Sequence, residues 1–292
     1  TGMQNSFETG VGLAKQLKAD SLRTILVISD GLNANGSELV KGFQSVLGDV
    51  PIVGGLAGDG FGFVKTLQLF NETVSDNQVI AVGLYGNALI TSSGALGGWR
   101  PYGPPRKVTK SEKNVVFEMD GKPALPLYRM YIGEAFARGL PGTGLNFPLA
   151  IIEEGKRDVE KIRTLLAIDN KNNSLTFAGN VEEGETVRLC QTNHDRLVEG
   201  AGNAANLVMN GLSVSKTNQV GLALCVSCVG RKGVMGENVS DEIKLVQQIL
   251  GSQTSVAGFY SYGEIAPRPN TTDSVLHNQT MTIGYLSENL LA

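Results

Sequence analysis

VAGFYSYGEIAP, residues 256–267, is the stretch around which we expect the rest of the chain to be organised. It begins apolar, passes the aromatic residues Tyr260 and Tyr262, turns at Gly263 and presents the carboxylate of Glu264. An acid at the mouth of a buried strand, beside a glycine that lets a ligand approach the backbone, is typical of a small-molecule contact. The alternative is a strand end that carries a solvated glutamate, which is the more common situation for this residue.

Length and composition exclude several classes of protein. With 292 residues the chain can form two domains of ordinary size or one large domain. A net charge of −3 gives no electrostatic footprint for nucleic acid, and no apolar run reaches the ~20 residues of a membrane-spanning helix. The 37 glycines lie between periodic apolar segments, which indicates many tight turns and close backbone approaches.

Cysteine and histidine usage predicts a cytoplasmic protein without a metal centre or cofactor. Three cysteines are too few for a disulfide framework, and residues 1–10 show no secretory signal pattern. The two histidines leave too few soft ligands for zinc and make a Ser- or Cys-based catalytic triad improbable.

The hydrophobic pattern predicts a mixed α/β protein. Short branched apolar runs, typical of buried strands, alternate with amphipathic helical segments. Ser6 and Ser37 are placed as helix caps. Composition marks residues 99–105 as a linker and the segment 230–238 as a loop. The predicted helices are 6–19, 37–47, 124–140, 195–211 and 241–251, and the predicted strands include 25–29, 50–53, 88–97, 148–152, 164–168, 174–177, 186–191, 220–228 and 255–259, with a hairpin in 66–86.

Two parts of the chain share one plan, which predicts two related strand–loop–helix–strand halves with mixed β-sheets flanked by helices. Each part ends with an acid that follows a glycine, Asp59 in the first and Glu264 in the second. If the halves pack as a pair, both acids face one cleft, together with the loops after Asp30 and Cys228. The first part comprises 25–29, 37–47 and 50–53, and the second comprises 220–228, 241–251 and 255–259.

The glycine-rich segment 54–62 does not have the order of a phosphate-binding loop, and Asp59 would repel phosphate. Its glycines either permit turns with positive φ or form a cradle in which Asp59 meets an ammonium group. Phe61 would then form part of the wall.

Arg231 and Cys228 follow the strand 220–228. Arginine is suited to bidentate recognition of a carboxylate, so Arg231 either binds a ligand or pairs internally with Glu264 or Asp59. Cys225 and Cys228 have the spacing of a redox pair, but residues three apart on a strand point to opposite faces. Core packing is therefore favoured for Cys225, while Cys228 at the strand end is open to either role.

These residues carry a resemblance to a known family. The C-terminal segments resemble the FIST C domain and the earlier ones resemble the second part of the FIST N domain, over nearly the whole chain. The C-terminal segments are LCVSCVGRKGVMG (224–236), GFYSYGEIAP (258–267) and LHNQTMT (276–282), and the earlier ones are ISDGLNANGSELVKGF (28–43), VGGLAGDGFGF (53–63) and WRPYGPPRKVTKSEKNVVFEMDGKPALPLY (99–128).

The resemblance implies an intracellular sensory module of signal transduction that binds small ligands such as amino acids and acts on an output domain or partner protein. It implies a FIST N-like domain over 1–121 and a FIST C-like domain over 122–292. Members of the family usually carry a further N-terminal strand–helix–strand segment before the position of Ser6, so we expect this chain to be a fragment of a longer protein.

The sequence therefore predicts a sensor that is not an enzyme, with ligand occupancy biasing the arrangement of the two halves. One alternative is a hydrolase or lyase that uses Cys228 or Ser227 with Glu264, and another is a protein-interaction scaffold. The predicted ligand contacts are Glu264, Arg231, Asp59, Asp30, Tyr260, Tyr262, Phe61 and Cys228.

Overall fold

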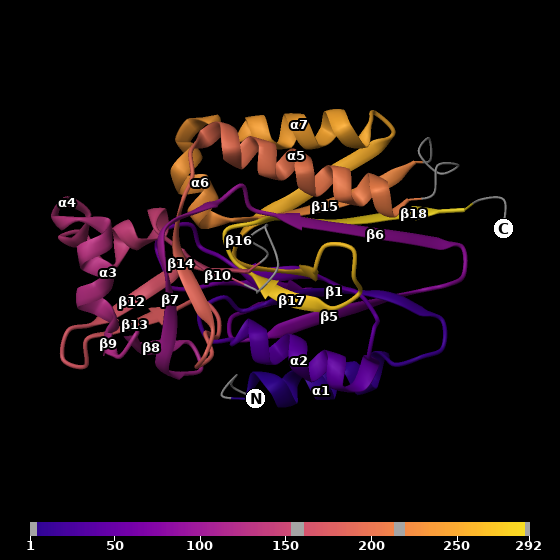
Figure 1. The fold of residues 1–292 in the computed structure, drawn as a ribbon. Helices are drawn as coiled ribbons and strands as arrows, with labels where there is room; N and C mark the ends of the chain where they lie inside the picture. Colours follow the sequence, from indigo (N-terminus) through magenta and orange to yellow (C-terminus); the bar gives the residue numbers. More distant parts are fainter. Residues whose placement is uncertain (1–4, 153–160, 213–219, 290–292) are drawn as a thin grey trace. The chain divides into compact units, whose positions relative to one another are not determined.

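The computed structural model describes residues 5–152, 161–212 and 220–289 (Figure 1). The chain divides into two compact units, and the second is inserted in the sequence of the first. Unit 1 comprises Thr1–Gly98 and Leu197–Ala292, and unit 2 comprises Trp99–Arg196.

Unit 1 is built on one mixed eight-stranded sheet. Seven of its strands lie in the order β5-β1-β2-β16-β15-β18-β6, and the eighth, β17, pairs with β16. A separate two-stranded sheet joins β3 and β4. The strands are β1 (Leu22–Ser29), β2 (Ile52–Ala57), β3 (Gln68–Phe70), β4 (Thr73–Ser75), β5 (Val79–Tyr85), β6 (Leu89–Leu96), β15 (Gly221–Cys228), β16 (Thr254–Pro267), β17 (Ser274–His277) and β18 (Met281–Glu288).

The two halves expected from the sequence are present in this sheet. β1 and β2 run parallel with β5 antiparallel to β1, and β15 and β16 run parallel with β18 antiparallel to β15. The halves meet where β2 and β16 pair antiparallel, with Gly54 opposite Ile265 and Gly55 opposite Glu264. The prediction of two related α/β halves with mixed pairing is confirmed.

Each half buries its own helices. Phe43 and Leu39 of α2 pack with Ile25 and Ile52 of β1 and β2, and Ala14 of α1 belongs to the same core. In the second half, α5 and α7 pack on β15 and β18 (Figure 1). The helices of unit 1 are α1 (Ser6–Leu17), α2 (Gly36–Leu47), α5 (His194–Gly211), α6 (Val229–Met235) and α7 (Ser240–Leu250), with α5 beginning three residues before the unit boundary.

Asparagine rather than serine caps the first two helices, so the caps predicted at Ser6 and Ser37 are wrong. The side chains of Asn5 and Asn35 accept hydrogen bonds from the backbone N–H groups three residues further on. An asparagine carbonyl serves this role as well as a serine hydroxyl. The Ser6 hydroxyl instead accepts a hydrogen bond from the Asn35 N–H at 2.9 Å, which joins the starts of α1 and α2.

Residues 256–267, the stretch VAGFYSYGEIAP, lie entirely within β16, and the chain does not turn at Gly263. Its first part continues the parallel ladder with β15, and from Ser261 it pairs with β2. A register irregularity between Ser261 and Gly263 accompanies this change of partner. The bulge takes the place of the turn expected there.

The segment 230–238, expected to be a loop, forms most of α6 and the short 3-10 helix Gly236–Asn238. Its glycines masked the helical signal, since glycine has low helix propensity. The helix places Arg231 inside unit 1 rather than on its surface.

Unit 2 is a second eight-stranded sheet with the order β11-β10-β14-β7-β8-β13-β12, and β9 pairs with β8. Its core gathers Leu125 and Tyr128 of α3 with strand residues such as Val116 and Phe177. The elements are β7 (Arg100–Glu112), β8 (Val115–Met119), β9 (Lys122–Pro123), α3 (Ala124–Ile132), α4 (Glu134–Ala137), a 3-10 helix (Gly142–Asn146), β10 (Leu149–Ile152), β11 (Lys161–Arg163), β12 (Leu165–Asp169), β13 (Ser174–Phe177) and β14 (Thr186–Gln191).

Two sequence predictions in unit 2 are wrong. Residues 100–105 belong to β7 and are not a linker. Tyr102 pairs with Leu189 and Arg106 with Val187, so Pro104 and Pro105 fall in a bulge where no ladder N–H is needed. Pro101 lies opposite Cys190 near the start of the strand. The helix expected over 124–140 stops at Ile132, because Gly133 adopts a φ of 81° and ends it.

Candidate functional site

Glu264 lies at the centre of a buried group of polar side chains. Its carboxylate is fully buried and accepts hydrogen bonds from the Ser261 hydroxyl at 2.6 Å and from the N–H and hydroxyl of Thr280 at 3.0 and 2.8 Å. Burial raises the pKa of Glu264 to about 7, although these donors and the charge of Arg231 act in the opposite direction. The solvated glutamate considered from the sequence is therefore not what the structure contains.

The Glu264 pKa predicts a pH-dependent stability. A glutamate with a raised folded-state pKa contributes stability that is fully present below pH 4.5 and is lost as the pH rises through 7. Glu264→Gln does not titrate, and its amide can donate to Ser261 while its oxygen accepts from Thr280. The free energy of unfolding of the wild type, minus that of Glu264→Gln, should fall by on the order of 3 kcal/mol between pH 4.5 and 8. Urea denaturation at several pH values measures this difference, and a pH-independent difference contradicts the assignment.

Arg231 is fully buried and paired inside the protein. Its guanidinium forms an ion pair with Glu242 of α7 at 2.7 Å, and it donates to the carbonyl oxygens of Gly97 and Leu197 and to the Ser227 hydroxyl. The internal-pairing alternative raised from the sequence therefore holds, but the partner is Glu242. That partner could not be chosen from the sequence while 230–238 was read as a loop.

Asp59 is exposed, and its carboxylate organises its own loop. It accepts hydrogen bonds from the Tyr262 hydroxyl and from the backbone N–H groups of Phe63, Val64 and Lys65. These hydrogen bonds lower the pKa of Asp59 below its ordinary range. The Tyr262 hydroxyl makes the largest contribution, and the backbone N–H groups add to it. The Phe63 ring stacks on Tyr262 with centroids 4.6 Å apart.

Asp30 is also fastened internally. It is 1% exposed and accepts hydrogen bonds from the N–H groups of Leu32, Asn33 and Asn77 and from the Thr66 hydroxyl. Burial raises its pKa, but these hydrogen bonds outweigh burial and lower it. The side chain joins the loop after β1 to the segment before β5.

Cys228 and Tyr260, two further predicted ligand contacts, lie near Arg231. Burial, and then the charge of Glu264, raises the pKa of the Cys228 thiol, which makes it a poor nucleophile. The half-buried Tyr260 donates to Glu242 at 3.1 Å, and Lys232 lies 5.2 Å from the centre of its ring.

The structure thus brings the predicted residues together in part. Glu264, Arg231 and Cys228 are close enough that the charge of Arg231 opposes, without cancelling, the rise in pKa that burial causes in Glu264 and Cys228. Asp59 and Tyr262 form a second group, which Phe61 does not join through any hydrogen bond among the described residues. Phe61 is 53% exposed, and its ring would lie 3.1 Å from a Cβ at Gly233 of α6. Within the part of the chain that the structure describes, the hydrogen bonds of the Asp30 carboxylate involve neither group.

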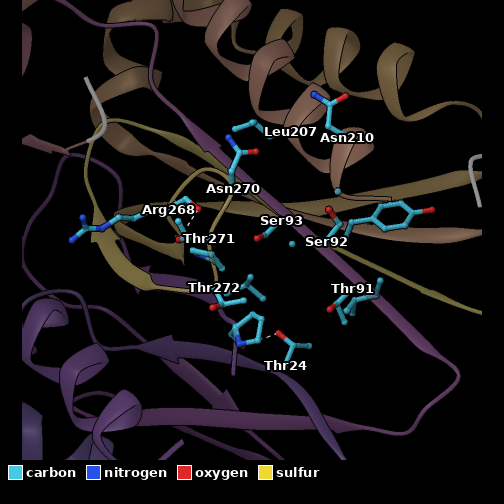
Figure 2. Close-up of a pocket in the computed structure, with 17 residues that line it drawn as sticks. Thr24, Thr91, Ser92, Ser93, Leu207, Asn210, Arg268, Asn270, Thr271 and Thr272 are labelled. Atoms are coloured by element: carbon cyan, nitrogen blue, oxygen red, sulfur yellow. Dashed lines mark hydrogen bonds between the residues drawn. The ribbon is translucent and has the colours of Figure 1, made fainter. Parts of the chain in front are cut away.

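A cavity of about 590 Å³ in unit 1 was not predicted from the sequence (Figure 2). Both halves contribute to its wall, together with β6 and the end of α5. Figure 2 shows hydroxyl groups of β6 and β1 on one side, Leu207 and Asn210 of α5 on another, and the loop after β16 on a third. The lining residues are Thr24, Pro51, Val53, Thr91, Ser92, Ser93, Leu207, Asn210, Gly211, Pro267, Arg268, Asn270, Thr271, Thr272, Gly284, Tyr285 and Leu286.

The lining mixes polar and apolar residues and is nearly uncharged. Arg268 is the one charged residue among the described lining residues, and its guanidinium extends away from the hydroxyl groups in Figure 2 and pairs with Asp273 at 3.2 Å. The hydroxyls of Thr91 and Ser93 have no hydrogen-bond partner among the residues that the structure describes, so they are available to a guest molecule. Three consecutive hydroxyl residues, 91–93, within an apolar strand were the sequence signal that could have found this wall.

None of the helices in the described ranges has the length and apolar character required to cross a membrane. Within 5–152, 161–212 and 220–289, no group of three or more His, Cys, Asp or Glu side chains is placed to hold a metal ion.

Two α/β halves are joined in one mixed sheet, and a cavity lies between their elements. Residues 1–122 match the FIST N domain and residues 124–267 match the FIST C domain. The chain belongs to the FIST family. FIST domains are sensory modules of signal transduction.

Similar proteins occur in bacteria and archaea. An uncharacterized protein of Mycobacterium bovis is 26% identical over 252 residues, which cover 83% of this chain and 62% of that protein. An uncharacterized protein of Mycobacterium tuberculosis is 26% identical over 250 residues, 83% of this chain and 63% of that protein. An uncharacterized protein of Methanocaldococcus jannaschii is 37% identical over 86 residues, 29% of this chain and 16% of its own length. The chain spans less than two thirds of the length of the mycobacterial relatives it matches.

Proposed function

We propose that this chain senses a small polar metabolite, an amino acid or a molecule of similar size, which binds in the 590 Å³ cavity of unit 1. The observation that carries the proposal is a polar wall to which both halves contribute, in a cavity of the size typical of small-molecule sites. Occupancy would act on an output domain or partner protein in the cytoplasm.

The lining supports a zwitterionic or neutral polar ligand. The hydroxyls of Thr91 and Ser93 can donate to a carboxylate or accept from an ammonium group. Asn210 and Gly211 end α5, and the C-terminus of a helix favours a positive charge. The charge of Arg268 is compensated by Asp273, which leaves the hydroxyl groups as the polar contacts of the wall.

The first test is a thermal-shift screen with the twenty amino acids, in the wild type and in Ser93→Phe. A ligand that binds the folded state should raise the melting temperature with increasing concentration. Ser93→Phe fills the cavity and should abolish the shift, whereas Ser255→Phe, which is exposed on β16 outside the cavity, should retain it. A shift that Ser93→Phe leaves intact contradicts binding in this cavity.

The eight residues predicted from the sequence stay a proposal for the ligand contacts, and the same screen tests them. Glu264→Gln and Asp59→Asn keep the size of each side chain and remove its charge. Suppose that these variants lose the thermal shift while Ser93→Phe retains it. The ligand would then bind between the segments that carry Asp59 and Glu264, and not in the cavity. The division into modules 1–121 and 122–292 also stays a proposal, and it is distinct from the two compact units.

The two alternative functions, an enzyme and a protein-interaction scaffold, would give different results in these experiments. Consumption of the stabilising ligand, lost in Cys228→Ala, would indicate a hydrolase or lyase. Partner capture that persists without any ligand response, and after loss of the charges of Arg231 and Glu264, would indicate a scaffold. The buried Cys228 thiol with its raised pKa supports the sensor over the enzyme.

A further inference from the structure

The cavity is lined by the two elements through which the chain passes into unit 2 and out of it. Thr91–Ser93 of β6 line the cavity, and the chain leaves unit 1 a few residues later, at Gly98. The chain returns at Leu197, near the start of α5, whose last residues line the cavity again. Both connections to unit 2 are therefore direct continuations of cavity walls.

β6 and α5 are in close backbone contact from the cavity to the junction. Near the cavity, the Ser92 hydroxyl donates to the carbonyl oxygen of Val208 at 2.8 Å. In the middle, a Cβ at Gly94 would lie 2.0 Å from the carbonyl oxygen of Ala204. A larger side chain at Gly94 would force the two elements apart. Two elements in contact at this range move together because packed interiors do not deform continuously.

The contact continues to the point where the chain leaves unit 1. A Cβ at Gly200 of α5 would lie 2.7 Å from the Gly98 nitrogen and 2.8 Å from the Gly97 carbonyl carbon. α5 has 18 residues, so it is a rod of about 27 Å between the cavity and this end.

Arg231 fastens the two connections to each other. One guanidinium donates to the carbonyl oxygen of Gly97, at the end of β6, and to that of Leu197, in the first turn of α5, at 2.9 Å for the latter. Glu242 of α7 holds the guanidinium at 2.7 Å, and Arg231 and Glu242 are both fully buried. All these contacts lie within unit 1.

We infer that β6 and α5, joined by the Arg231 guanidinium, form the output path of the cavity: occupancy displaces them together and changes the two connections to unit 2. The inference rests on the proposed function of the cavity, since it names how occupancy leaves the site. Its physical basis is one continuous pair of rigid elements with the cavity at one end and the junction at the other.

A covalent occupant tests the path without knowledge of the natural ligand. In Ser93→Cys the new thiol faces the cavity, while Cys190, Cys225 and Cys228 are buried, so N-ethylmaleimide should label this position selectively. Hydrogen exchange is then followed at the amides of Gly98–Arg100 and Arg196–Leu197, with α2 amides as an internal reference. We expect the junction amides to change exchange rate by at least about fivefold on labelling, the lower end of coupling between distant sites.

Three controls make the outcome specific. Ser255→Cys with the same label, exposed on β16 outside the cavity, should leave junction exchange unchanged. Thr91→Cys provides a second attachment point in the cavity if Ser93→Cys does not fold. In the background of Arg231→Met with Glu242→Leu, which replaces the ion pair by apolar side chains, the labelled cavity should no longer change exchange at both connections together.

The inference is overturned if labelled Ser93→Cys and Thr91→Cys leave the junction amides unchanged, or if the response survives unaltered without Arg231 and Glu242. These outcomes are independent of the amino-acid screen. A screen without binding combined with a junction response would reject the ligand class and retain the path, and the reverse pattern would retain the ligand and reject the path.

Discussion

Replacement of Arg231 by methionine should destabilise unit 1 by about 3–5 kcal/mol, because removal of one partner leaves an unpaired buried charge. Glu242 is fully buried, and it would retain only the hydroxyl donors of Ser227 and Tyr260 at 3.0 and 3.1 Å. The carbonyl oxygens of Gly97 and Leu197 would lose a charged donor as well. The loss is expected in the urea denaturation midpoint of the wild type compared with Arg231→Met.

The double variant Arg231→Met with Glu242→Leu is the control, because apolar side chains of similar volume can replace a buried ion pair at little cost. It should recover most of the stability that the single variant loses. An Arg231→Met protein as stable as the wild type would show that Glu242 is solvated or neutral, contrary to the structure.

Replacement of Gly54 by alanine should cost more than about 3 kcal/mol, since it combines backbone strain with an overlap of backbone atoms. Gly54 has a φ of 140°, which side chains of L-residues rarely adopt, and a Cβ there would lie 1.9 Å from the carbonyl oxygen of Val27. Gly54 pairs with Val27 of β1 on one side and with Ile265 of β16 on the other. The overlap therefore falls at the strand that joins the two halves.

Gly48→Ala separates the two causes of that loss. Gly48 also has a positive φ, of 60°, but nothing lies within 4 Å of a Cβ there. Its ψ of −124° lies outside the left-handed helical region, so alanine there should lose about 1–3 kcal/mol, the range of backbone strain alone. Chemical denaturation of both variants measures the difference, and equal losses would mean that the close approach to Val27 relaxes without cost.

The sequence located the repeat because its signals are local. A branched apolar run, a helical pattern and a glycine before an acid occur twice in the same order, and each can be read within about fifteen residues. What the sequence could not supply was the partner of each charged group.

Burial and pairing depend on distant segments, which explains the remaining differences. Arg231 finds Glu242 only when α6 is a helix that turns the guanidinium inward. The cavity is made from six separate stretches whose serine, threonine and asparagine residues are individually ordinary. The Asp59 carboxylate is occupied by its own loop, an arrangement that follows from the backbone and not from residue type.

The pairing of β2 with β16 has a consequence for synthesis of the chain. β2 is buried along its whole length, yet the strand that covers one of its edges lies roughly 200 residues further along. At the rate of translation, that edge of β2 stays unpaired for roughly 10–40 s until Ile265 is synthesised. An uncovered flat edge is a template for pairing with other chains. Production at high expression rates should therefore favour aggregation of the nascent protein over folding.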